Sequence, residues 1–337
     1  MANDMRQGTV AGIDVSAATL DAMRVGSEGT VAVEQFANTA AGHRRARRWL
    51  AAGGGPVRVV LEATGVYHRA LTRTLAATAG VEVMVANPRA VAAFAQALQP
   101  RTRTDRTMAS VLCAYAQHMA FRPWHSPPAA AQQLQLVARR IAQLTGTQTQ
   151  EKNRLHALTA SGEAPAAVVH DVRQELRALE RRLALLTREA QRLIDAAPLL
   201  RRAFQRLVSI PGIAQTSAIQ LLGELAVWPP DLTVRQWVAS AGLDVRVVQS
   251  GTSVHSRPRL SKVGNARIRA ALYLPALSAV QHEPHVRAFH QALVARGKAP
   301  QQAIAAVMRK LLHAIYGMLK ADAAWDGARF RRLPQAA

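Results

Sequence analysis

The chain has 337 residues, nearly half of them hydrophobic, which is enough for two domains with buried cores and excludes a disordered protein. Its 43 lysine and arginine residues face 21 acidic residues, and the formal charge of +22 indicates a polyanion as partner, DNA or RNA before a membrane surface. A single cysteine excludes a disulfide framework and a thiolate metal site. No apolar run approaches the ~20 residues that span a bilayer, so we expect a cytoplasmic protein, associated with the nucleoid and without a membrane partner.

The N-terminal third alternates between strand and helix patterns. Apolar and β-branched residues predict three consecutive strands at 9–15, 23–26 and 31–36, then a basic helix at 40–52. A mostly apolar strand at 57–61, a helix at 67–79, a strand at 81–86 and helices at 89–98 and 106–120 follow. This order matches a ribonuclease H-like fold.

Three acids fall at informative places in that order. Asp14 lies near the end of the first strand, Glu62 follows the fourth, and Asp105 opens a helix after a basic loop. Oxygen ligands that converge from separate elements suit Mg²⁺, so we expect a magnesium site here. Each acid also has an ordinary alternative: Asp14 as a turn cap, Glu62 as a solvated strand end, and Asp105 as a helix N-cap.

The middle of the chain predicts two long helices after a proline-rich break at 124–128. Leucine and other apolar residues recur at heptad spacing over 134–158 and again, without interruption, over 169–193. The pattern indicates a coiled coil, either as a hairpin within the chain or with another chain, and favours oligomerisation.

The C-terminal third contains a serine in a turn with many basic neighbours. A Pro-Gly turn at 210–213 precedes a helix at 215–225 and resembles half of a helix-hairpin-helix, whose helix start holds a DNA phosphate. Further helices are predicted at 234–241, 266–280 and 303–319. Ser250 lies between them, either as a nucleophile toward a phosphodiester or as part of a loop that only contacts phosphate. The residues expected to contact nucleic acid are Arg257, Arg259, Lys262, Arg267, Arg101 and Arg103.

These patterns divide the chain into four regions. We expect an α/β ribonuclease H-like metal-binding domain over 1–124 and a helical coiled-coil linker over 125–200. A mainly α C-terminal domain that contains Ser250 follows over 201–325, and a tail over 326–337.

Taken together, the motifs resemble the IS110 family of transposases over nearly the full chain. The N-terminal motifs are Gly12-Ile13-Asp14-Val15-Ser16, Leu61-Glu62-Ala63-Thr64-Gly65 and Thr104-Asp105-Arg106. The C-terminal motifs are Ser209-Ile210-Pro211-Gly212-Ile213, Gln249-Ser250-Gly251 and Ser261-Lys262-Val263-Gly264.

The resemblance implies a mechanism and partners. The family's RuvC-like domain binds Mg²⁺ through an Asp-Glu-Asp-Asp set, whose first three members correspond to Asp14, Glu62 and Asp105. Its C-terminal serine forms a covalent phosphoserine link to DNA, a role that falls on Ser250. Donor and target DNA, a structured guide RNA and a homo-oligomer, dimer or tetramer, are implied as partners.

One position departs from the family pattern. The fourth acid is expected three residues after Asp105, where this chain has Met108, whose thioether does not hold Mg²⁺. The favoured hypothesis is a transposase or recombinase that cleaves and rejoins DNA through phosphoserine. The alternatives are a metal-dependent junction nuclease in which Ser250 only binds, and a decayed protein that binds DNA or RNA without catalysis.

Overall fold

The computed structural model describes residues 8–52, 55–63, 65–98, 104–251, 254–255 and 258–333. The chain forms two compact units, Met1–Ser126 and Pro127–Ala337. Arg101, Arg103 and Arg257, three of the residues expected to contact nucleic acid, lie outside the described residues.

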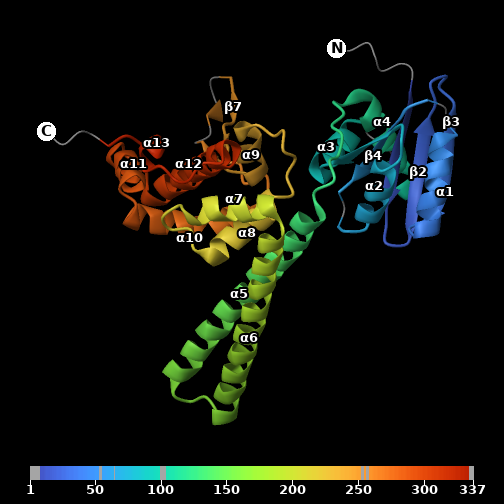
Figure 1. Ribbon diagram of the computed structural model, residues 1–337. Coiled ribbons are helices and arrows are strands. Elements are labelled where there is room, and N and C mark those ends of the chain that lie inside the picture. The colour runs from blue at the N-terminus through green and yellow to red at the C-terminus, as the bar shows by residue number, and fades with distance from the viewer. Residues whose placement is uncertain are drawn as a thin grey trace. The chain divides into compact units, whose positions relative to one another are not determined.

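The N-terminal unit is built on a five-stranded mixed sheet in the order β3-β2-β1-β4-β5 (Figure 1). The first three strands form an antiparallel meander, and β4 and β5 continue from β1 in parallel. This sheet confirms the α/β class and is consistent with the predicted ribonuclease H-like fold. The strands are β1 (Thr9–Val15), β2 (Thr19–Val25), β3 (Val31–Ala37), β4 (Val57–Glu62) and β5 (Val81–Ala86).

The second strand begins earlier than predicted, at Thr19 and not at residue 23. Ser16 closes a tight turn: its backbone N–H donates to the Thr19 carbonyl at 2.9 Å, and its Oγ accepts the Thr19 N–H at 2.9 Å. Pairing therefore resumes at once, with Val15 opposite Leu20. The sequence pattern missed this start because the polar Thr19 and Asp21 interrupt the apolar run.

The two faces of the sheet are covered by different helices. Ala11, Ile13 and Val15 join the core beneath α1 (Ala40–Ala51) and α2 (His68–Ala76). Because side chains alternate along a strand, Val10 and Val60 join the other core, beneath α3 (Pro88–Leu98) and α4 (Asp105–His118). Even-numbered positions of β1 and β4 therefore face α3 and α4.

The C-terminal unit begins with a helical hairpin. Helices α5 (Ala129–Ser161) and α6 (Ala166–Ala196) pack along each other, and the first ends at Gly162 in the left-handed conformation (φ 69°). Of the two predicted arrangements, the structure has the hairpin within one chain (Figure 1). A coiled-coil geometry for the pair stays a prediction.

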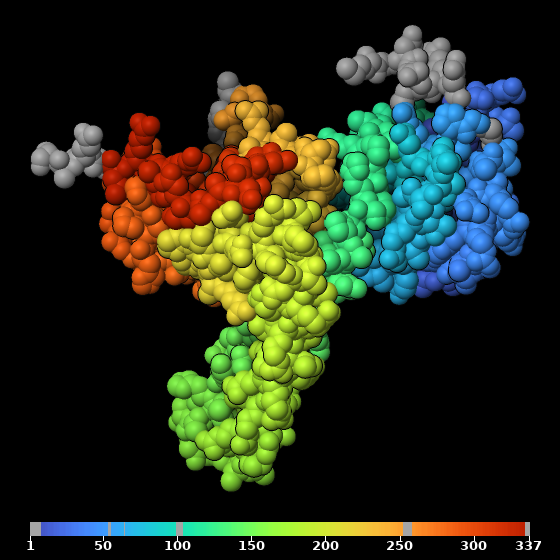
Figure 2. Space-filling view, viewed as in Figure 1, coloured from blue at the N-terminus to red at the C-terminus, as the bar shows by residue number. Residues whose placement is uncertain are grey.

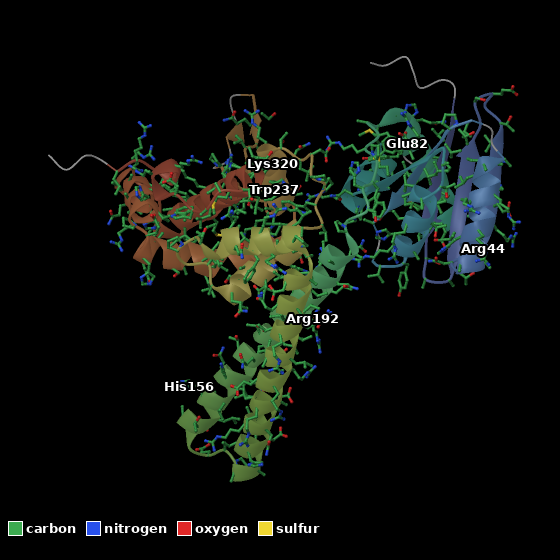
Figure 3. All side chains as sticks on the ribbon, in the orientation of Figure 1. Arg44, Glu82, His156, Arg192, Trp237 and Lys320 are labelled. Atoms are coloured by element: carbon green, nitrogen blue, oxygen red, sulfur yellow. The ribbon has the colours of Figure 1, made fainter. Side chains whose placement is uncertain are left out.

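The remaining helices of this unit surround one large core. Trp237 of α9 lies edge-on to Tyr316 of α12, and Lys320 approaches the same Tyr316 ring at 5.8 Å; Figure 3 labels Trp237 and Lys320. Gly212 has φ 97°, and a Cβ there would lie 2.8 Å from the backbone of α10, so the predicted Pro-Gly turn is a close packing point. The helices are α7 (Pro198–Val208), α8 (Gln215–Leu225), α9 (Val234–Ala241), α10 (Ala266–His282), α11 (Pro284–Ala295), α12 (Pro300–Ala321) and α13 (Gly327–Phe330).

The first residues of the expected tail, 326–333, include a short helix. Asp326 caps α13 by accepting the Ala328 N–H, and Phe330 is only 4% exposed. Its ring packs edge-on against Phe289 of α11 at 5.7 Å. The short apolar signal of one phenylalanine among arginines was too weak to predict this docking.

Among the described residues, no helix combines the length and the apolarity that crossing a membrane requires.

Candidate catalytic acids and serine arm

A glycine brings α4 directly onto β1. A Cβ at Gly12 would lie 2.2 Å from the Cys113 nitrogen and 2.3 Å from the Ala109 carbonyl oxygen, so only glycine admits this approach. The Cys113 thiol also donates to the Val10 carbonyl at 3.6 Å. The strand and the helix are thereby held in close backbone contact around Cys113. Asp105, the first residue of α4, lies near enough to Asp14 for its negative charge to raise the pKa of that carboxyl.

The register of the sheet places the second acid beside the first. β1 and β4 pair in parallel up to Ile13 opposite Leu61, so the next positions, Asp14 and Glu62, are neighbours. Both are even-numbered and therefore face α3 and α4. Both are partly buried.

Neighbouring charges act on Asp14. Its pKa is raised from 3.8 to about 6, first by burial and then by the negative charges of Asp105, Glu62 and Asp21, against a hydrogen bond from the Val15 N–H at 3.0 Å. Such repulsion requires that the carboxylates lie near one another. Asp105 and Glu62, which come from two other elements, therefore lie near enough to Asp14 to affect it by charge.

Two of the ordinary alternatives are excluded. Thr104, and not Asp105, is the N-cap of α4, because its side chain accepts the Thr107 N–H at 3.2 Å. Ser16, and not Asp14, closes the turn after β1. Neither acid has a capping role, and Asp105 as the first helical residue places its charge at the favourable end of the helix dipole.

Met108, one turn along α4 from Asp105, packs against the apolar cluster that contains Val60 and Ala86. An acid at this position would lose those contacts, so the departure from the family pattern is accommodated by the core. Asp21 faces the same side of the sheet as Asp14, its direct partner across β1 and β2, and its Oδ1 accepts a hydrogen bond from Gln35 at 3.0 Å.

The acidic site formed by Asp14, Glu62 and Asp105 offers carboxylate oxygens only, the ligands that a hard divalent cation prefers. Asp14 and Glu62 are partly buried, and Asp105 is exposed. In the part of the chain that the structure describes, no three His, Cys, Asp or Glu side chains lie as close together as the ligands of one ion. The acids are thus near enough to interact by charge but are not arranged as a closed coordination shell.

Ser250 lies on a β-arm of the C-terminal unit. β7 (Gln249–Ser250) pairs antiparallel with β8 (Val254–His255), and β6 (Val245–Arg246) pairs with β9 (Arg259–Leu260). The structure therefore replaces the predicted turn at Ser250 by a strand position that directly precedes Gly251, which has φ 55°. Ser250 is exposed, so its hydroxyl is accessible to a large substrate.

The arm presents cations that face each other. Arg246 and Arg259 are directly opposed in the β6–β9 ladder, and both are exposed. Like charges at opposed positions destabilise a ladder, and no ion pair of either arginine is formed within the described residues. Lys262 is also exposed and adopts φ 52°, a strained value for lysine. These three side chains are available to phosphate.

Backbone hydrogen bonds close the base of the arm. The Ser261 N–H donates to the Asp244 carbonyl at 2.9 Å and the Asn265 N–H donates to the Ser240 carbonyl at 2.7 Å. Gly264 has φ 148°, and a Cβ there would lie 2.4 Å from the Ser240 oxygen. The two ends of the arm are therefore held together directly before α10 begins.

A buried carboxylate that sequence reasoning missed supports this base. Glu224 of α8 is 3% exposed and accepts hydrogen bonds from Arg139 at 2.6 and 2.9 Å and from Asn265 Nδ2 at 2.7 Å. Asn265 in turn caps α10. Arg267, expected to contact nucleic acid, is half-exposed and lies 3.8 Å from Glu224. Burial opposes ionisation of Glu224, but the bonds from Arg139 and Asn265 outweigh it and lower its pKa.

The sequence did contain a signal for Glu224. It is the one charged residue in the stretch Leu221-Leu222-Gly223-Glu224-Leu225, where an apolar residue fits the helix pattern. A charge at such a position is buried only with partners, and those partners come from helices distant in sequence.

A mixed-sheet unit with converging acids and a basic helical unit with an exposed serine define a DNA-processing class of protein. Residues 11–161 match a family model of IS110 elements described as "Transposase", and residues 204–291 match one described as "Transposase IS116/IS110/IS902 family". The chain belongs to the IS110 family of transposases. That membership makes it one of a family of DNA-rearranging enzymes, which generally use divalent metal ions and act on DNA.

Relatives share most of the chain's length. It is 26% identical to the pilin gene-inverting protein of Moraxella bovis over 323 residues, an alignment that covers 94% of this chain and 98% of the relative. The protein of the same name from Moraxella lacunata has the same identity and coverage. A 43.6 kDa protein of insertion element IS110 from Streptomyces coelicolor is 27% identical over 153 residues, covering 45% of this chain and 36% of that one.

Proposed function

We propose that the protein cleaves and rejoins DNA strands of an insertion element through a covalent phosphoserine at Ser250, assisted by Mg²⁺ at Asp14, Glu62 and Asp105. The observation that carries the proposal is that the register of β1 and β4 makes Asp14 and Glu62 neighbours, with Asp105 near enough to act on Asp14 by charge. The exposed Ser250, on the same arm as the opposed Arg246 and Arg259, supports the second half of it.

The serine reaction balances without a further reactant. Ser250 Oγ forms a bond to phosphorus, its proton passes to a base, and the bond from phosphorus to a deoxyribose oxygen breaks. The released hydroxyl takes up a proton, and a hydroxyl of the partner strand later displaces the serine. Arg246, Arg259 and Lys262 neutralise the phosphate backbone beside the attacked position. Magnesium at the acidic site supplies positive charge for a phosphate oxygen.

The acids have their own task in this scheme. Asp14, Glu62 and Asp105 present oxygen ligands from β1, β4 and α4, so a rigid sheet and one helix fix their relative positions. Asp105 stands at the positive end of the α4 dipole. Met108 leaves the set one acid short, so Asp14, Glu62 and Asp105 are the residues that would hold the ion.

We also propose that the protein binds a structured guide RNA and acts as a homo-oligomer, either a dimer or a tetramer. The charge of +22 supports more than one nucleic acid segment as partner. The long α5–α6 hairpin, whose far end keeps exposed apolar residues such as Val168, supports pairing with a second chain. Arg101, Arg103 and Arg257 remain proposed contacts to nucleic acid, beside Arg267.

Met108 favours one second candidate, a decayed protein that binds nucleic acid without cleaving it. Its thioether lies in an apolar cluster and offers nothing to a cation. A junction nuclease, in which Ser250 only binds, is the third possibility.

The test is a denaturing gel of end-labelled donor and target DNA incubated with the protein, the RNA encoded beside its element, and Mg²⁺. We expect a protein–DNA adduct with the native chain and none with Ser250→Ala or Asp14→Asn. Cleaved DNA without an adduct in both the native chain and Ser250→Ala identifies the junction nuclease. Activity that appears only after Met108→Asp identifies the decayed protein.

A further inference from the structure

A cavity of about 280 Å³ lies between α12 and the α13 segment of the C-terminal unit. Figure 2 shows the residues of these two helices, coloured red, on the visible surface. Aromatic and apolar side chains form much of its wall, notably Trp325, Phe330 and Met318, and Gly317 lines it without a side chain. Lys310, His313, Asp326 and Arg329 supply its polar groups.

The wall of this cavity is anchored at several points. The Trp325 N–H donates to Ser209 Oγ at 3.0 Å, and the Trp325 ring lies 5.5 Å from that of Phe330. A Cβ at Gly327 would lie 2.4 Å from both the Glu283 carboxylate and the His285 ring, so α13 is pressed against the start of α11. The tryptophan is therefore held in a fixed position at the cavity and does not belong to a loose chain end.

The cations at the cavity exceed its acids. The Lys310 ammonium lies 4.3 Å from the centre of the Phe289 ring and 4.8 Å from that of Phe330. No carboxylate pairs with it within the described residues. Burial lowers the pKa of Lys310, and the charge of Arg331 lowers it further. Arg329 has one partner, Asp326 at 3.4 Å, and is otherwise exposed.

These features fit one class of ligand. The volume is just below the range of roughly 300–1,000 Å³ for small-molecule pockets, so a single ring system fits and an extended ligand does not. A tryptophan face offers stacking to any base, Asp326 can accept a hydrogen bond from an exocyclic amino group, and Lys310 with Arg329 can hold a phosphate. A nucleotide within a duplex cannot present its base in this way.

We propose that the cavity between α12 and α13 binds one unpaired nucleotide of a nucleic acid strand, stacked on Trp325 with its phosphate between Lys310 and Arg329. This inference rests on the nucleic acid partner of the proposed function. It does not depend on Ser250, so a failure of the covalent chemistry would leave it unaffected.

The test compares the affinities of the full chain for labelled 12-nucleotide single strands of RNA and of DNA, and for the matching duplexes, by fluorescence anisotropy. Trp325→Leu keeps an apolar wall but removes the stacking face. We expect it to weaken single-strand binding about tenfold, in the range for loss of one stacked base, and to leave duplex binding unchanged. Trp325→Tyr restores most of the affinity. The RNA and DNA arms identify which strand supplies the nucleotide.

The matched control is Trp228→Leu, which removes another partly buried tryptophan that packs edge-on against Trp237; it leaves binding unchanged. Equal single-strand affinity of Trp325→Leu and the native chain overturns the proposal, as does an equal loss for single strands and duplexes. If Trp325→Leu melts early, Arg329→Gln replaces it, because that side chain is 76% exposed. A loss confined to single strands supports the site, and no loss overturns it.

Discussion

Substitution of Glu224 by alanine tests whether the buried carboxylate holds the base of the serine arm. The change leaves Arg139 and Asn265 without their acceptor inside the C-terminal unit. Breaking a buried pair costs ~3–5 kcal/mol. Because the Arg139 side chain is 30% exposed and can reach water, we expect about 2–4 kcal/mol here. For a unit of this size that corresponds to a fall in unfolding midpoint of roughly 4–16 °C.

Differential scanning calorimetry of the full chain measures this fall in the unfolding midpoint, read from the transition of the C-terminal unit. The matched control is Glu189→Ala. Glu189 makes the same two-bond contact with an arginine, to Arg192 at 2.8 and 2.7 Å, but on an exposed helix surface. We expect no measurable shift for the control. Equal shifts for the two variants would refute the reasoning, since burial would then have no part in the effect.

The remaining predictions concern the acidic site, the α4 contact and the arm. The raised pKa of Asp14 means that the folded chain holds this proton more tightly than the unfolded chain, so the native protein loses stability as the pH rises from about 4 to about 6. The variant Asp14→Asn lacks that loss, so its melting midpoint rises relative to that of the native chain as the pH goes from about 4 to about 6. Millimolar Mg²⁺ then narrows this difference, and a difference that stays constant across the pH range contradicts the prediction. Gly12→Ala forces α4 from β1 and lowers the free energy of unfolding by about 3 kcal/mol in urea titrations. By contrast, Gly146→Ala, in open space on α5, raises it by roughly 0.5–1 kcal/mol. Arg259→Gln reduces the slope of log affinity for DNA against log salt by about 1, while Arg192→Gln leaves it unchanged.

The sequence predicted the parts of the fold that depend on local pattern. Strand alternation around Ile13 and the continuous apolar run at 57–61 were sufficient for the sheet, and the order of strands suggested which ends would carry acids. That reasoning predicted Asp14 beside Glu62, because the ends of neighbouring parallel strands share one edge of a sheet. Asp105 was added as the acid that opens the helix after the basic loop.

What the sequence did not reveal depends on contacts between distant segments. The role of Glu224 requires Arg139 and Asn265 from two other helices, and the docking of Phe330 requires Phe289. Ser250 lies in a strand because of pairing across the arm, and strands of two residues are too short to show a periodic sequence pattern. The family resemblance supplied the proposed role of Ser250 as a nucleophile, which local composition alone would have left as a phosphate contact.

The most direct measurement of the central claim is mass spectrometry of the protein after reaction with DNA, RNA and Mg²⁺. Trypsin does not cleave between Arg257 and Pro258, so residues 247–259 form one peptide. We predict that this peptide gains the mass of a nucleotide and that fragmentation assigns it to Ser250, not to Thr252, Ser253 or Ser256. Recombined DNA with this peptide unmodified throughout the reaction, or with the nucleotide on another residue, would contradict the account.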